Sequence, residues 1–242
     1  MSSENKQVSG DITKETNYKG FLLDLVIYLP IMFLIREVSI PNTSFIVTGL
    51  FWSFTTLAVA SWRMKVRNIS WKELGLRRPQ NFKKTLLVAG LILVTTIICL
   101  LAFNIIKDQL PFFADQISEP EASTKPEGSK FGNLKGNWGL FFAIMPMVLI
   151  ESCLEELLDR GFLINWFEKV FSKTSFATLI AVVLQAAIFG FRHSYDLSER
   201  SITVGIIGLI MGIAYVKSGR NLWPLIIAHC VLNTMSMIDR VV

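Results

Sequence analysis

The sequence has few of the charged residues with which a soluble protein covers its surface. Only 18% of its 242 residues are charged, whereas 52% are hydrophobic, and the mean hydropathy is +0.48. A soluble domain of this size has too little polar material to shield that much apolar surface from water. The composition therefore excludes a soluble globular protein and predicts an integral membrane protein.

The sequence also lacks internal repeats, low-complexity tracts and any soluble domain, so a single membrane domain over residues 20–242 is the simplest organisation. Residues 1–19 are polar, mix both signs of charge and do not resemble a cleavable signal peptide. We expect them to form a cytoplasmic tail that precedes the insertion signal, the first hydrophobic helix. The three cysteines lie in apolar segments and indicate neither a disulfide nor a cysteine metal site.

Seven hydrophobic segments are long enough, or nearly so, to cross a bilayer core of about 30 Å as helices. Uninterrupted apolar runs favour helices over the alternating strands of a membrane barrel. The predicted fold is an all-α polytopic transmembrane bundle of seven helices, or eight if the long fourth segment is two. Pro146 predicts a kink in that segment, and Pro224 suits the first turn of the last helix. The segments are Phe21–Ile35, Ser44–Trp62, Thr85–Ile106, Leu140–Phe167, Ser175–Phe191, Ile202–Val216 and Leu222–Ile238.

The net charge of +5 is concentrated in one part of the chain and does not indicate a nucleic-acid partner. By the positive-inside rule, the basic stretch between the second and third predicted helices faces the cytoplasm, and the N-terminus with it. Segment Lys107–Trp138, which is richer in acidic residues, is then external. We expect a multi-pass cell-membrane protein surrounded by lipid. The basic residues are Arg63, Lys65, Arg67, Lys72, Arg77, Arg78, Lys83 and Lys84.

The fourth segment contains five ionisable residues: Glu151, Glu155, Glu156, Asp159 and Arg160. A charge at the centre of a membrane helix costs about 2.5–3.5 kcal/mol, so these residues should face a bundle interior, a wet cavity or the interface. Glu156 and Arg160 are four residues apart and can form an ion pair. Glu155 points about 100° away and has only like-charged neighbours on its own helix, which suits a proton acceptor. The alternative is a helix end with solvated charges at the membrane surface.

The chain has only two histidines, and both lie in predicted helices. His193 ends the fifth helix, and His229 lies in the last, one turn before Asn233. Taken singly, each histidine is more typical of a packed, hydrogen-bonded residue than of a ligand. Together with Glu155 they can hold and deprotonate a water molecule, or bind zinc through Glu155, His193 and His229. The HExxH pattern of many zinc proteases is absent.

Three spaced motifs carry a family resemblance: Glu155-Glu156-xxx-Arg160, Phe189-xxx-His193 and His229-xxx-Asn233. Their order and separation resemble those of the CPBP intramembrane proteases, the CAAX-protease and bacteriocin-processing family, also called Abi. The likeness covers about Leu140–Asp239, and Trp71–Pro79 resembles a loop motif upstream in bacterial members. Asp159 is a departure, because members usually have an aromatic residue there.

The resemblance implies a role for each motif residue. Glu155 would be the general base that activates water together with His193, and Glu156 and Arg160 would form a structural pair. The oxyanion would be stabilised by His229 and Asn233. Both zinc-dependent and metal-free mechanisms have been described for the family, and we favour the metal-free one.

The resulting hypothesis is an intramembrane endopeptidase that hydrolyses a peptide bond of a membrane-associated protein or peptide. In a bacterial member, the reaction would serve peptide maturation, bacteriocin immunity or cleavage of a membrane regulator. One alternative is a non-catalytic membrane binding or regulatory protein of the same fold. A second is a small proton-coupled transporter, which the lack of Gly/Pro-broken helices in matching halves disfavours.

Overall fold

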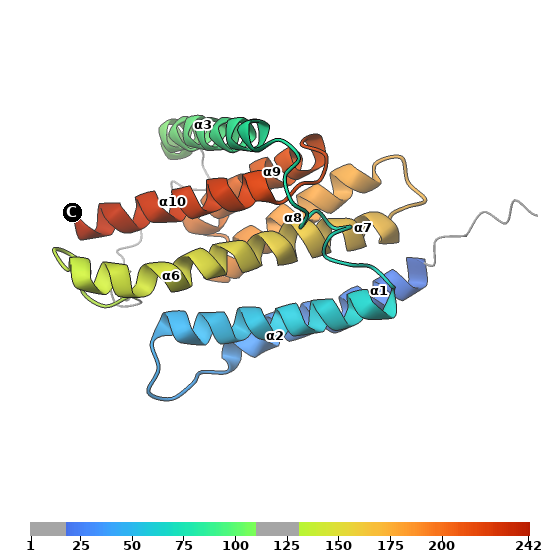
Figure 1. Cartoon of the computed structure of the whole chain (residues 1–242), viewed down its shortest axis with the longest axis horizontal. Coiled ribbons are helices and arrows are strands. Elements are labelled where there is room, and N and C mark those ends of the chain that lie inside the picture. Colours follow the sequence, from blue (N-terminus) through green and yellow to red (C-terminus); the bar gives the residue numbers. More distant parts are fainter. Residues whose placement is uncertain (1–17, 110–130) are drawn as a thin grey trace, which may run out of the picture.

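The computed structural model of the chain describes residues 18–109 and 131–242. Within these ranges seven long helical segments run roughly along one axis and no strand is present, so the predicted all-α bundle is confirmed (Figure 1). Predictions about the N-terminal tail up to residue 17, and about residues 110–130 of the external segment, lie outside the described residues. The helices are α1 (Tyr18–Leu34), α2 (Phe45–Val66), α3 (Phe82–Ile106), α6 (Trp138–Glu155), α8 (Ala177–Ser194), α9 (Glu199–Lys217) and α10 (Trp223–Val241).

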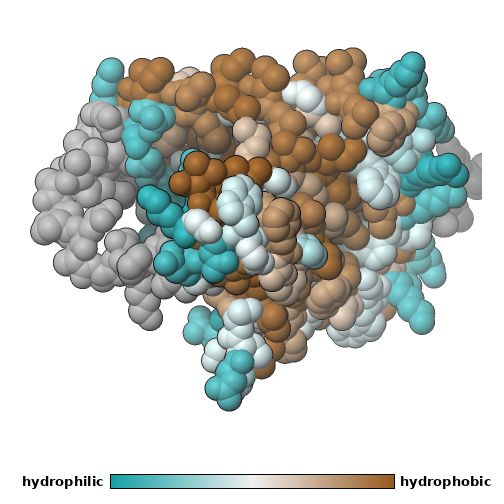
Figure 2. Space-filling model, turned by 60° about the vertical axis from the view of Figure 1, so that its left-hand side comes forward, coloured by the Kyte–Doolittle hydropathy of each residue, from teal (hydrophilic) through white to brown (hydrophobic). Residues whose placement is uncertain are grey.

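The surface of the bundle has the character of a membrane protein. Five helices, α1, α2, α3, α8 and α9, are long and apolar enough to cross a bilayer. Figure 2 shows a broad hydrophobic area over the middle of one face, with hydrophilic residues concentrated toward its two ends. Large apolar side chains such as Leu87 and Ile105 are more than half exposed, as expected where lipid replaces water. The chain is thus a helical membrane protein.

The long fourth segment forms one continuous helical path with a change of geometry in its middle. Helix α6 is followed directly by the π-helical segment Glu156–Ile164 and then by α7 (Asn165–Val170). Pro146 lies inside α6, which continues beyond it to Glu155. The sequence does not predict the π-helical segment, a rare geometry that is frequent at functional sites. The segment is one unit, so the bundle has seven members rather than eight.

A buried carboxylate that the sequence analysis did not single out anchors the first helix. Asp24 of α1 accepts hydrogen bonds from Arg63 at 2.6 Å, from Arg67 at 2.7 Å and from Trp166 of α7 at 3.0 Å. The network corrects one prediction. Arg63 and Lys65 lie within α2, which extends four residues beyond Trp62, and Lys83 and Lys84 lie in the first turn of α3, which begins at Phe82, so these four are not in the loop between the helices. Pairing with Asp24 lets Arg63 remain in the bundle interior.

Helices α8 and α9 pack closely because small residues line their contact. A Cβ atom on Gly190 of α8 would lie 2.9 Å from the Cα atom of Gly205 of α9, which is closer than real contacts allow. A Cβ atom added to Gly208 of α9 would lie 3.1 Å from the ring of Phe189. Such residues allow helix backbones to approach each other in a membrane. This contact fixes the end of α8, which carries His193.

Candidate active site

Glu155, the last residue of α6, is approached by a histidine from each of two other helices. Its Oε1 atom lies 3.7 Å from Nε2 of His193, at the end of α8. Its Oε2 atom lies 3.5 Å from Nε2 of His229, in the middle of α10. Both separations are longer than a usual hydrogen bond of about 2.9 Å. The structure therefore brings the predicted base and both histidines together without direct hydrogen bonds between them.

The other nitrogen of each histidine is held by a hydrogen-bond acceptor. Nδ1 of His193 donates to the carbonyl oxygen of Phe189 at 2.7 Å. Nδ1 of His229 donates to the Glu156 carboxylate, also at 2.7 Å. An acceptor at Nδ1 fixes both the ring orientation and the tautomer. Neutral His193 therefore presents the lone pair of Nε2 toward Glu155, whereas His229, with a carboxylate at Nδ1, can hold a second proton at Nε2 and donate it in a hydrogen bond.

Glu156 and Arg160 form the ion pair that their spacing predicts. The two side chains are fully buried, and their charged atoms are 3.0 Å apart. The guanidinium of Arg160 also lies over the ring of Phe189, 4.3 Å from its centre. Glu156 is shared between Arg160 and His229. The pair thus links the π-helical segment to α8 and α10, and its carboxylate holds the His229 ring at Nδ1, the nitrogen that faces away from Glu155.

Arg192 is a charged residue of the site that the sequence analysis missed. Its guanidinium lies 2.8 Å from Asp159 and 3.5 Å from Glu155. The like-charged neighbours of Glu155 on its own helix are therefore offset by a cation that comes from α8. The same contact explains how an acidic residue can lie buried at position 159, since Arg192 offsets the negative charge of Asp159. The adjacent His193 was the only sequence signal that pointed to this position.

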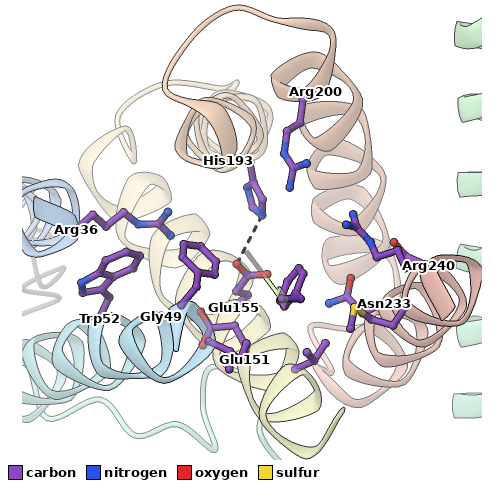
Figure 3. Close-up of a pocket in the computed structure, with 15 residues that line it drawn as sticks. Arg36, Gly49, Trp52, Glu151, Glu155, His193, Arg200, Asn233 and Arg240 are labelled. Atoms are coloured by element: carbon purple, nitrogen blue, oxygen red, sulfur yellow. Dashed lines mark ion pairs between the residues drawn. The ribbon is translucent and has the colours of Figure 1, made fainter. Parts of the chain in front are cut away.

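Glu155, His193 and Asn233 line a cavity of about 240 Å³ (Figure 3). In this view Glu155 and His193 point toward each other, with Asn233 on the opposite side of Glu155 from Arg36. Asn233 donates through Nδ2 to Ser152 Oγ at 2.8 Å. His229 is not among the described residues that line the cavity, and it reaches the site through its contact with Glu155.

The predicted zinc alternative finds no support in this arrangement. Among residues 18–109 and 131–242, no group of three or more His, Cys, Asp or Glu side chains has the geometry to hold a metal ion. As placed, Glu155, His193 and His229 do not form such a group. The reaction proposed below therefore contains no step through a metal.

Residues 137–235 match the family described as Rce1-like, type II CAAX prenyl endopeptidase. The family resemblance is confirmed. This CAAX-endopeptidase-like segment contains all residues of the three spaced motifs, and the family that it matches is described as one of endopeptidases. No match was found among curated proteins or among solved structures. The motif residues that lie within the matched range are Glu155, Glu156, Arg160, Phe189, His193, His229 and Asn233.

Proposed function

We propose that the protein is an intramembrane endopeptidase that hydrolyses a peptide bond of a membrane-associated protein or peptide. The observation that carries the proposal is the meeting of Glu155 and His193 at a cavity inside a membrane bundle. Their side chains come from separate helices of the CAAX-endopeptidase-like segment. A buried carboxylate beside an oriented imidazole is the arrangement that general-base catalysis needs.

The proposed reaction begins with a water molecule between Glu155 and His193. The Glu155 carboxylate and Nε2 of neutral His193 are both acceptors, so a water can donate one O–H to each. Glu155 takes one proton while the water oxygen attacks the carbonyl carbon of the scissile bond. The tetrahedral intermediate then breaks its C–N bond as a proton passes to the leaving amine. The products are a carboxylic acid and an amine.

The negative oxygen of the intermediate needs hydrogen-bond donors. The amide of Asn233 lines the cavity and is the more direct candidate. His229 is the second, because the Glu156 carboxylate behind its ring stabilises positive charge there. The Glu156–Arg160 pair would then serve catalysis indirectly, by holding His229. Donors of this kind are most effective where they are fixed before the reaction begins.

A metal-free mechanism predicts a specific response to chelators. Incubation with 1,10-phenanthroline or EDTA should leave the cleavage rate of the purified protein unchanged. Inhibition that is reversed by added zinc would instead assign Glu155, His193 and His229 as metal ligands. Metal analysis of the same sample provides an independent measurement, since a resident zinc would be present at about one per chain.

We also propose that the N-terminus faces the cytoplasm. The basic residues around the end of α2 and the start of α3 support this orientation. The catalytic cavity is lined by the first residues of α2, and thus opens toward the external half of the membrane. Cysteine labelling in intact cells tests the proposal. Labelling of the Lys72→Cys variant from outside by an impermeant reagent would reverse the orientation and leave the reaction unaffected.

The endopeptidase activity itself can be tested with purified protein in nanodiscs and a set of single-span membrane peptides. Mass spectrometry of the products should show cleavage at a defined bond by the wild-type protein and none by the Glu155→Ala variant. Equal cleavage by both would identify a contaminating protease. Absence of cleavage together with unchanged peptide binding by the two proteins would favour a non-catalytic membrane binding protein of the same fold.

A further inference from the structure

An apolar groove lies between α3 and α9, away from the catalytic cavity. Its volume is about 310 Å³. It involves the first half of α3 and the last part of α9, whereas the catalytic cavity meets α9 at Arg200, near its start. The proposed hydrolysis uses no residue of the groove. The apolar lining consists of Val88, Leu91 and Ile92 of α3 with Ile210, Ile213 and Ala214 of α9.

The groove has a polar end at the side of the membrane that we assign to the cytoplasm. Lys217 and Ser218 line it there. Lys84 lies four residues before Val88, on the same face of α3. The side chains of Lys84 and Lys217 are exposed, and neither forms an ion pair with another described residue. The groove is therefore apolar along its length and positively charged at one end.

A third cation is fixed at this end by the loop after α2. Arg77 donates to the carbonyl oxygen of Gly219, the residue that follows Ser218, at 2.8 Å. Arg77 belongs to the Trp71–Pro79 motif, to which the proposed hydrolysis gives no role. The backbone path of the motif brings the Arg77 guanidinium to the end of α9.

Hydrogen bonds to its backbone hold the Trp71–Pro79 motif in place. The Gly75 carbonyl oxygen accepts from the Leu222 amide at 3.1 Å, and the Tyr215 hydroxyl donates to the Leu74 carbonyl oxygen at 2.7 Å. Gly75 has a φ of +104°, and a Cβ atom there would collide with the Arg220 carbonyl oxygen. The loop is thus built to dock on the turn between α9 and α10.

We propose that the groove is a binding site for an anionic phospholipid, with one acyl chain between α3 and α9 and the headgroup phosphate bound by Lys217, Ser218 and Arg77. Val88–Thr95 spans about 10 Å, roughly a third of the bilayer core, which is the depth of the upper part of an acyl chain. Basic pockets between membrane helices on the cytoplasmic side are typical sites for anionic headgroups. The charge of the cluster selects an anionic lipid over a zwitterionic one.

The headgroup half of the proposal can be tested by native mass spectrometry of the full-length protein. Nanodiscs of equal parts phosphatidylglycerol and phosphatidylcholine provide the probe lipids, and the retained ratio of the two is measured. Lys217→Gln should lower phosphatidylglycerol retention about fivefold, because one surface cation contributes about that factor. Arg77→Gln should have a similar effect. The matched control is Lys65→Gln, which removes an exposed cation at the same membrane face but outside the groove. Equal loss in the control would overturn the site.

The acyl-chain half needs a variant that keeps the charges. Ala214→Phe fills the groove and should also lower phosphatidylglycerol retention. If that variant does not fold, as judged by its melting temperature in detergent, Thr95→Leu fills the groove at its other wall. Normal retention in a folded groove-filled variant, or displacement of the lipid by millimolar inorganic phosphate, would reduce the site to a surface anion site and overturn the lipid proposal.

Discussion

Helix α3 and the π-helical segment Glu156–Ile164 lie in the same bundle but are composed and placed in opposite ways. Helix α3 has no charged side chain between Lys84 and its end at Ile106, yet only four of its 25 residues are buried. It lies at the edge of the bundle in Figure 1. The π-helical segment contains three charged side chains, and eight of its nine residues are buried. Among the five helices that could cross a bilayer, the most apolar is the least buried, whereas this charged segment is almost completely buried.

The contrast shows what organises the interior of a membrane protein. Lipid solvates apolar side chains as well as a protein core does, so hydrophobicity alone does not bring α3 inward. Charged groups must avoid lipid, and those in the interior are paired, as Asp159 is with Arg192 of α8 and Arg160 is with Glu156. Close contacts between small residues, as between α8 and α9, further fix how the helices pack. The following experiments test this contrast, beginning with the largest expected effect.

Changes in the charged residues of α6 that precede the π-helical segment should act first on chemistry. Glu155→Gln keeps the size of the side chain but removes the base, and kcat should fall by about 10²–10⁴-fold. Glu151→Gln is the matched control, because Glu151 lines the same cavity but is engaged by Ser53 at 2.5 Å. We expect a much smaller loss for it. Similar losses for the two variants would mean that the reaction needs negative charge in the cavity rather than a base at Glu155.

The next effect separates catalysis from helix packing at Asn233. Loss of an oxyanion donor in Asn233→Ala should lower kcat by about 10²–10³-fold, or 2.7–4 kcal/mol, and leave KM nearly unchanged. Ser152→Ala removes the hydrogen-bond partner of Asn233 and should cost only about 0.6 kcal/mol of stability. A loss confined to KM, or equal kcat values for the two variants, would leave Asn233 as an interhelical packing residue.

Close packing of α8 on α9 should be sensitive to a single methyl group. Gly190→Ala should destabilise the protein by about 1–3 kcal/mol, because the added Cβ atom meets the backbone of α9. Gly205→Ala is the control on the opposite helix, since its nearest new contact would be at 3.7 Å, an ordinary distance. Thermal unfolding in one detergent compares them. Tolerance of Gly190→Ala would show that the two helices can separate without loss of stability.

The smallest effect should come from the outer face of α3. Leu87 is 64% exposed, so Leu87→Ala exchanges one lipid contact for another and should change stability by less than about 0.5 kcal/mol. Ile92→Ala on the buried face of the same helix should cost more, because Ile92 is only 3% exposed. Unfolding curves for both proteins measure the difference. A large cost for Leu87→Ala would reveal a protein contact on that face and end the contrast drawn above.

The sequence predicts the parts of this architecture that depend on one helix at a time. Apolar length gives the seven segments, and the spacing of Glu156 and Arg160 gives their ion pair. The meeting of Glu155 with two histidines follows from motif resemblance and from the cost of charge in lipid. The partners Arg192 and Asp24 were missed because contacts between helices depend on how each helix is rotated, which periodicity along one chain segment does not determine.

The π-helical segment also sets an angular phase between the two ends of the fourth helical path. Closure of all nine residues of the segment as an ordinary α-helix would put more rotation into the same stretch, because each residue turns further in an α-helix than in a π-helix. Everything after it would then turn relative to α6. Trp166 would point away from Asp24 and the first helix would lose an anchor, while Glu155 kept its place. The π-helical turn therefore fixes the angle between the two ends of this helical path, so that Glu155, the proposed base, points in one direction and Trp166 in another.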